Sequence, residues 1–354
     1  MGETEDHGSP TATFSASTTP TSGSPEQNVA GRAPSVVVSY AGGEEIHSRL
    51  SGWAVAMPSK TSEFSRHQLL SEIEHADALV CLGDVIVDKA LLEAAGHLKV
   101  VARIGVGYDN VDVEACSAAG VVVTVTQGGP EEATAEVTIG LMFAACRHFS
   151  DAQRELMTAP VQAWEFERFR GKDVAGSTLG LVGYGRIAKA VERRAYCLDM
   201  KVLHHARHNT GSPGYVSVLE DLLAECDVLS MHVPASRDTY HLINARRLSL
   251  FRDGAVLINT SRGSVLDEAA VAEALRSKKL FAVGLDVFEN EPCTESPLRG
   301  MERAILLPHI GGNTFNSYER MVELAISSVK EVMSGGIPPS AVNAQPLRRL
   351  TSRV

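Results

Sequence analysis

An arginine, a glutamate and a histidine each follow a short apolar run in the second half of the 354-residue chain. Arg262 comes soon after "AVLIN", Glu291 after "VGLDV", and His309 directly after "AILLP". Because ligands of open α/β sheets bind at the carboxyl ends of the strands, we expect the three side chains to converge. A guanidinium binds a carboxylate with two hydrogen bonds, and histidine titrates near neutrality. Each residue alone also fits a structural role, but together they predict proton transfer beside a bound anion.

A glycine-rich turn, "GLVGYGRIA", lies upstream between an apolar run and a helical pattern. Gly183, Gly185 and Ala188 fit the G-x-G-x-x-G/A pattern, in which the first glycine permits a tight turn and the second lets the backbone approach a pyrophosphate. The free N–H groups and the dipole of the following helix favour phosphates. The turn therefore predicts a dinucleotide site that includes Gly183, Tyr184, Gly185, Arg186 and Ile187.

The next strand, "MKVLHHA", ends at the position that selects between cofactors. An NAD site usually has Asp or Glu about 20 residues beyond the first glycine, where the carboxylate accepts hydrogen bonds from the ribose. Ala206 stands there instead, and Arg207 follows with a guanidinium that suits a phosphate. We therefore expect NADP(H) to be favoured over NAD(H), with His205 at the adenosine side. The alternative is that Arg207 is a solvated loop residue.

The composition gives no support to several classes of function, although a local basic pocket stays open. The net charge of -10 gives no support for binding nucleic acid or an anionic membrane, and no apolar run approaches the length of a membrane span. The six cysteines are scattered singly, without the spacing of a zinc site. We expect a cytoplasmic protein with reduced thiols and no metal.

Two series of β-branched runs alternate with stretches of helical period, at residues 35–127 and 176–311. Such alternation indicates parallel sheets flanked by helices. Between the series, "PEEATAEVTIGLMFAACRH" has proline and acids at its start and basic residues at its end, which are helix boundary signals. A last amphipathic helix, "NTFNSYERMVELAISSVKEVMSG", has no strand after it and is expected to pack back on the first unit.

The predicted fold is thus α/β, with two Rossmann-like, doubly wound parallel-sheet domains and the active-site cleft between them. Residues 35–147 and 312–346 are expected to form a flavodoxin-like substrate domain, and residues 148–311 the dinucleotide-binding Rossmann domain. Residues 1–34, rich in Ser, Thr, Pro and Gly, are expected to be a disordered tail, and residues 347–354 a second tail.

Five segments in this order resemble the D-isomer-specific 2-hydroxyacid dehydrogenase family: "ARIGVGYDNVDVEA", "GYGRIA", "NTSRGSVLDE", "GLDVFENEP" and "LPHIGG". The resemblance spans about residues 35–346. It implies reduction of a 2-keto acid, or the reverse oxidation, in which Arg262 binds the substrate, His309 transfers the proton and Glu291 supports His309. It also implies a homodimer formed through the cofactor domains.

The resemblance assigns further residues. Backbone N–H groups of Val106 and Gly107 would hold the substrate carboxylate, Asp286 would lie near the nicotinamide carboxamide, and Thr134 near the nicotinamide phosphate. The remaining expected cofactor contacts are Val233, Pro234, Thr260, Ser261 and Gly311.

Within the family, NADPH-linked glyoxylate and hydroxypyruvate reductases also lack an acid at the position of Ala206. We therefore favour a reductase of this type. A phosphoglycerate dehydrogenase-like enzyme and a specialised biosynthetic 2-keto acid reductase remain alternatives. Phosphonate dehydrogenases carry a lysine where Val106 stands. The C-terminal binding protein corepressors, a non-enzymatic alternative, carry a tryptophan just past the histidine, where this chain has "GGN".

Overall fold

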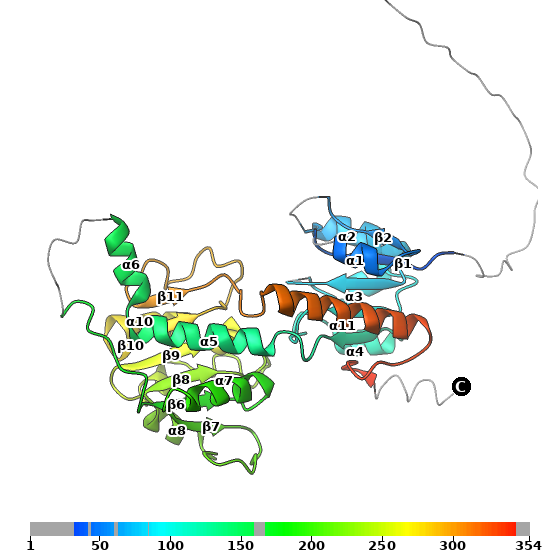
Figure 1. The fold of residues 1–354 in the computed structure, drawn as a ribbon. Coiled ribbons are helices and arrows are strands. Elements are labelled where there is room, and N and C mark those ends of the chain that lie inside the picture. The colour runs from blue at the N-terminus through cyan, green and yellow to red at the C-terminus, as the bar shows by residue number, and fades with distance from the viewer. Residues whose placement is uncertain (1–31, 42–43, 60–62, 84, 159–166, 345–354) are drawn as a thin grey trace, which may run out of the picture. The chain divides into compact units, whose positions relative to one another are not determined.

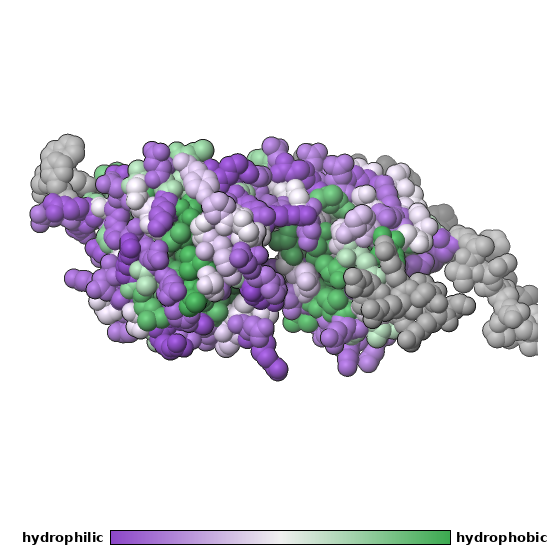
Figure 2. Space-filling model, turned by 90° about the horizontal axis from the view of Figure 1, so that it is seen from below, coloured by the Kyte–Doolittle hydropathy of each residue, from purple (hydrophilic) through white to green (hydrophobic). Residues whose placement is uncertain are grey.

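The computed structural model describes residues 32–41, 44–59, 63–83, 85–158 and 167–344 (Figure 1). The two expected tails fall outside these ranges, except for residues 32–34. No helix within the described ranges is long and apolar enough to cross a membrane. On the face drawn in Figure 2, hydrophilic side chains dominate and hydrophobic residues show between them.

The first sheet has five parallel strands in the order β2-β1-β3-β4-β5. Its strands are short and mostly buried, as is usual for parallel strands covered on both faces. The strands are β1 (Ser35–Val38), β2 (Ala54–Ala56), β3 (Ala78–Cys81), β4 (Val100–Arg103) and β5 (Val122–Val125). The helices are α1 (Glu44–Arg49), α2 (Arg66–Glu72), η1 (Ile73–His75), α3 (Lys89–Ala94), α4 (Val113–Ala118) and, far along the chain, α11 (Phe315–Met333).

Side-chain caps begin several of these helices. Ser65 forms a capping box with Gln68 at α2, Asp88 accepts a backbone hydrogen bond at α3, and Asp112 does so at α4. Helix α11 packs against β4 and β5, and its apolar face joins the same core as β1, β3 and β4. Helix α11, from the C-terminal part of the chain, therefore covers one face of the sheet whose strand β4 leads into residues 105–110.

The second sheet has six parallel strands in the order β11-β10-β9-β8-β6-β7. The chain leaves β6 to one side for β7 and returns to its other side for β8, so the carboxyl ends of β6 and β8 form the topological switch point. The strands are β6 (Thr178–Val182), β7 (Lys201–His205), β8 (Val228–Met231), β9 (Ala255–Asn259), β10 (Leu280–Leu285) and β11 (Ala304–Leu306). The helices are α6 (Phe149–Thr158), α7 (Arg186–Tyr196), α8 (Leu219–Glu225), α9 (Ala245–Leu248), η2 (Gly263–Val265) and α10 (Glu268–Arg276).

Helix α5 (Glu131–Cys146), drawn in green in Figure 1, packs on this second sheet. Its residues Ala135, Leu141 and Met142 are buried in one core with β6, β8 and β9. The predicted boundary at residue 147 groups this helix with the first domain, while the family resemblance implies an interdomain helix. Its core contacts belong to the second sheet, because its weakly charged sequence offers an apolar face to β9 and β10. The expected class, two α/β units with parallel sheets, is confirmed.

Candidate active site

His309 and Glu291 form a close pair. His309 Nδ1 lies 2.6 Å from Glu291 Oε2, while Glu291 Oε1 accepts a hydrogen bond from the backbone N–H of Phe288. The hydrogen bond to Glu291, aided by its charge, raises the pKa of His309 against the opposing effect of burial. Burial acts to raise the pKa of Glu291, but the contacts with His309 and Phe288 outweigh it, so that pKa lies below its usual range. The pair therefore favours a protonated imidazole beside an ionised carboxylate.

The backbone of residues 309–311, which we call the histidine loop, is held by Asp286, the residue that follows β10. The N–H of His309 donates to the Asp286 carbonyl at 2.8 Å, and the N–H groups of Ile310 and Gly311 donate to its two carboxylate oxygens at 2.8 and 2.7 Å. His309 has a left-handed backbone with a φ of 55°, which few residues other than glycine adopt. These bonds stabilise that conformation and so fix the backbone position from which the imidazole extends.

Asp286 is 1% exposed, and burial raises its carboxyl pKa despite the two N–H bonds. A Cβ on Gly311 would come within 2.8 Å of its Oδ2 atom, so glycine is needed at that position. The resemblance places Asp286 near the nicotinamide carboxamide. In this structure both carboxylate oxygens serve the histidine loop, a role that sequence reasoning did not foresee.

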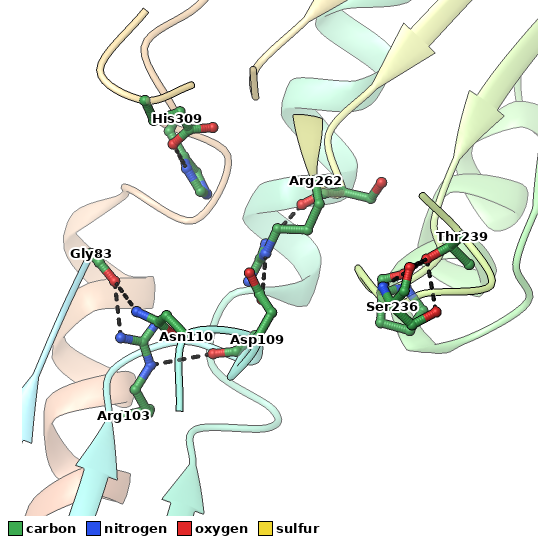
Figure 3. A network of polar contacts seen from close by, with 12 residues as sticks. Gly83, Arg103, Asp109, Asn110, Ser236, Thr239, Arg262 and His309 are labelled. Carbon is green, nitrogen blue, oxygen red and sulfur yellow. Dashed lines mark hydrogen bonds and ion pairs between the residues drawn. The ribbon is translucent and has the colours of Figure 1, made fainter. Parts of the chain in front are cut away.

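Arg262 lies between β9 and the short helix η2, and its guanidinium contacts the segment after β4. Its Nη1 donates to the Ser261 carbonyl at 2.7 Å, and its Nε donates to Asp109 Oδ1 at 2.8 Å. Nη2 lies against Gly107, where an added Cβ would be only 1.3 Å away. The structure thus brings the expected substrate arginine to the expected substrate loop of Val106 and Gly107. In Figure 3 the side chains of Arg262 and His309 point toward the same region.

The glycine turn has the form that a dinucleotide requires. Gly183 has a φ of 92°, its N–H donates to the His205 carbonyl, and an added Cβ would lie 2.4 Å from the His232 carbonyl oxygen. In contrast, nothing lies within 4 Å of the position of a Cβ on Gly185, so the turn is open in front of helix α7. A tight turn, open space and a helix N-terminus fit a pyrophosphate.

The side chains of the turn have separate contacts. The Tyr184 hydroxyl donates to Glu192 at 2.6 Å, and its ring stacks on His204 with centroids 3.6 Å apart. Arg186 is largely exposed and lies 3.7 Å from Glu131, whereas Ile187 packs against the apolar core. Tyr184 and Ile187 are therefore suited to contribute backbone groups, and Arg186 its guanidinium.

At the end of β7, the histidines are tied to the protein and the arginine is exposed. His205 Nδ1 lies 3.0 Å from the Val216 carbonyl oxygen, and the buried His204 lies 2.7 Å from the Thr210 hydroxyl through Nε2. Within the part of the chain that the structure describes, no hydrogen bond or ion pair involves the Arg207 side chain. Sequence reasoning gave His204 no role, although strand alternation next to His205 indicates an inward-facing side chain.

The remaining expected contacts surround the carboxyl ends of the second sheet. Thr260 and Thr138 share a hydroxyl hydrogen bond of 2.8 Å, and Ser261 donates to Asn259. Thr134 is buried near Gly311, while Val233 and Pro234 follow the end of β8. No group of three or more His, Cys, Asp or Glu side chains that could hold a metal ion occurs among the described residues.

The second sheet carries a glycine turn at its switch point, an arginine after β9, and a histidine–glutamate pair after β10 and β11. These features together define a nucleotide-dependent oxidoreductase with an α/β fold. Residues 139–311 match the sequence model of the D-isomer specific 2-hydroxyacid dehydrogenase NAD-binding domain. A glyoxylate reductase from Pyrococcus horikoshii is 37% identical over 295 residues, which cover 81% of this chain and 88% of that protein.

Solved structures of similar proteins support the same family. The TT0316 protein of Thermus thermophilus has a TM-score of 0.82 at 37% identity and covers 87% of this chain and 99% of its own. The NADPH-dependent glyoxylate/hydroxypyruvate reductase of Sinorhizobium meliloti, solved with NADP and malonate, has a TM-score of 0.77 at 29% identity, covering 88% and 98%. The chain belongs to the D-isomer-specific 2-hydroxyacid dehydrogenase family. It is an NAD(P)-dependent oxidoreductase that acts on a CH–OH group.

Proposed function

We propose that the protein reduces a small 2-keto acid of the glyoxylate or hydroxypyruvate type and prefers NADP(H) to NAD(H). The observation that carries the proposal is the His309–Glu291 pair, which favours an imidazolium in the region that the Arg262 side chain also points toward. The relatives described as glyoxylate reductases support the substrate class.

In the proposed mechanism, the substrate carboxylate binds the Arg262 guanidinium and the backbone N–H groups of Val106 and Gly107. Arg262 also polarises the keto group, and His309 donates a proton to the carbonyl oxygen as the bond order falls. Glu291 orients the imidazole and stabilises its charge. The nicotinamide nucleotide, when bound, supplies the hydride.

We assign the nucleotide to the carboxyl ends of the second sheet. The open space at Gly185 and the N-terminus of α7 suit the pyrophosphate. The residues proposed to hold the nucleotide are Thr134, Gly183, Tyr184, Gly185, Arg186, Ile187, His205, Ala206, Arg207, Val233, Pro234, Thr260, Ser261, Asp286 and Gly311.

The preference for NADP(H) rests on two neighbouring residues. Ala206 has no carboxylate that would repel a 2′-phosphate, and the exposed Arg207 guanidinium has no competing partner among the described residues. His205 uses Nδ1 for Val216, so its other ring nitrogen is left to face the adenosine side.

The same proposal covers organisation and location. We assign residues 35–147 with 312–346 to substrate binding and residues 148–311 to nucleotide binding, except that helix α5 of the first range packs on the nucleotide-binding sheet and brings Thr134 to it. A homodimer is supported by helix α6, which has no buried residue and exposes Phe149, Leu156 and Met157 by 55%, 67% and 80%. A cytoplasmic location is supported by the cysteines, which are all free.

The test is a kinetic panel of glyoxylate, hydroxypyruvate, pyruvate, and larger or phosphorylated 2-keto acids, each with NADPH and NADH. We expect the highest kcat/KM for glyoxylate or hydroxypyruvate with NADPH. Equal or higher kcat/KM with NADH would contradict the cofactor preference. A much higher value for a larger or phosphorylated 2-keto acid would instead favour a biosynthetic or phosphoglycerate dehydrogenase-like enzyme.

A further inference from the structure

Asp109 is an acidic residue without an assigned role that contacts the proposed substrate arginine. It lies in the segment after β4, and its Oδ1 accepts a hydrogen bond from Arg262 Nε at 2.8 Å. The side chains of Asp109 and Arg262 are 38% and 25% exposed. Burial acts to raise the pKa of Asp109, but the charge and hydrogen bond of Arg262 outweigh it and leave that pKa below its usual range. The pair is therefore an ion pair at neutral pH.

The contacts of the guanidinium leave one nitrogen directed at the substrate loop. Asp109 holds Nε, and the Ser261 carbonyl accepts from Nη1 at 2.7 Å. Nη2 lies against Gly107, on the loop whose N–H groups we assign to the substrate carboxylate. Two anchors on different nitrogens fix both the position and the plane of a guanidinium, because its donors form a rigid fork.

Asp109 is itself held by its segment. Arg103, only 6% exposed, donates to the carbonyl oxygens of Gly83 at 2.9 Å and Gly107 at 3.3 Å. Asn110 donates to the carbonyl oxygens of Gly83 and Val85. Figure 3 shows the bonds of Arg103 and Asn110 to Gly83, and the Arg262–Asp109 pair beside them. The hydrogen bonds of Arg103 and Asn110 thus hold the backbone from which the Asp109 carboxylate extends.

We propose that Asp109 is a positioning residue, which holds the Arg262 guanidinium so that Nη2 faces the carboxylate site at residues 106–107. This inference rests on the proposed role of Arg262. The alternative is competition, in which the Asp109 carboxylate would bind the Arg262 guanidinium until the substrate carboxylate displaced it. The positive charges of Arg262 and Arg103 both act on Asp109 and offset part of its negative charge.

The experiment compares Asp109→Ala, Asp109→Asn and the matched control Asp253→Ala. Asp253 forms an ion pair with Lys279 at 2.8 Å before the start of β9, whereas Arg262 follows the end of that strand. Oxalate is the probe: calorimetry measures its affinity for the nucleotide-loaded enzyme, and glyoxylate kinetics are recorded in parallel. Thermal unfolding of each variant monitors its fold.

We expect Asp109→Ala to weaken oxalate binding about tenfold and to raise the KM for glyoxylate similarly, with a smaller change in kcat. Asp109→Asn, which keeps an acceptor oxygen for Nε, should recover most of the loss, and Asp253→Ala should match the wild type. In an Arg262→Lys background, which lacks the fork, Asp109→Ala should add no further loss.

Unchanged or tighter oxalate binding by a folded Asp109→Ala variant would overturn the inference, and tighter binding would indicate competition. An additive loss in the Arg262→Lys background would also overturn it, because Asp109 would then act independently of Arg262. Oxalate binding separates this inference from the proposed function. A wild type that binds oxalate but does not reduce glyoxylate would disprove the substrate, while the Asp109 comparison would still give its answer.

Discussion

The histidine loop and the end of strand β7 differ in how firmly the protein holds their key side chains. The backbone of residues 309–311 is fixed by three hydrogen bonds to Asp286, and the His309 imidazole is paired with Glu291. Arg207, in contrast, is exposed and has no hydrogen bond or ion pair with any described residue. Groups that act on a developing charge gain from being fixed in advance, because no reorganisation is then needed during the reaction. A side chain that only recognises a ligand can be ordered when the ligand binds, at some cost in affinity.

The largest expected effect tests the fixed side of this comparison. His309→Ala should lower kcat for reduction by about 10²–10⁴, the usual contribution of general acid catalysis. The affinity for the nucleotide should change little, because the assigned nucleotide contacts remain. Steady-state kinetics with glyoxylate and NADPH, together with fluorescence titration of NADPH, measure both quantities. Near-normal turnover would remove His309 from the proposed chemistry.

A smaller effect is expected when the partner of the imidazole is changed. In Glu291→Gln the carboxylate that raises the pKa of His309 is lost, so that pKa should fall. Reduction needs the protonated imidazole, and kcat/KM falls as pH rises through its pKa. The alkaline limb of the profile should therefore move to lower pH, with a loss of about 10- to 100-fold above the limb and less below it.

The chain offers a matched control for this change. Glu289, two residues earlier, forms a comparable pair with His241 at 3.0 Å. Glu289→Gln removes the same charge from the same segment but leaves the His309–Glu291 pair intact, so its alkaline limb should stay in place. A limb that moves equally in both variants would mean that the general field of the segment, rather than the direct contact, sets the pKa of His309.

Much of the fold could be predicted because its signals are local. Apolar runs of four to six residues became buried strands, and the glycine turn lies at the switch point of the second sheet as the pattern required. The packing of α5 could not be read in the same way. Its sequence indicates a buried helix, but which sheet it covers depends on contacts with β9 and β10, more than 100 residues away.

The grouping of the candidate residues could be predicted where a residue type implies its own chemistry. Arg262, Glu291 and His309 carry such signals: His309 contacts Glu291, and in Figure 3 the side chains of His309 and Arg262 point toward the same region. Asp286 and Asp109 do not, because a carboxylate can bind a ligand, cap a loop or anchor an arginine. Only the contacts distinguish these roles: two backbone N–H groups for Asp286, and Arg262 for Asp109.

The smallest expected effect tests the unfixed side of the comparison. Arg207→Ala should lower kcat/KM for NADPH about tenfold, since an exposed guanidinium–phosphate contact is worth about 1.4 kcal/mol. The value for NADH should stay the same, because NADH has no 2′-phosphate.

Lys201→Ala is the matched control: Lys201 lies at the opposite end of β7, pairs with Glu225 at 3.8 Å, and carries the same charge. Kinetics with both nucleotides at two salt concentrations measure the effect, and the NADPH loss should shrink at high salt as the contact is screened. Equal losses for NADPH and NADH would show that Arg207 acts on the shared part of the nucleotide, and equal losses in Arg207→Ala and Lys201→Ala would reduce its role to general charge.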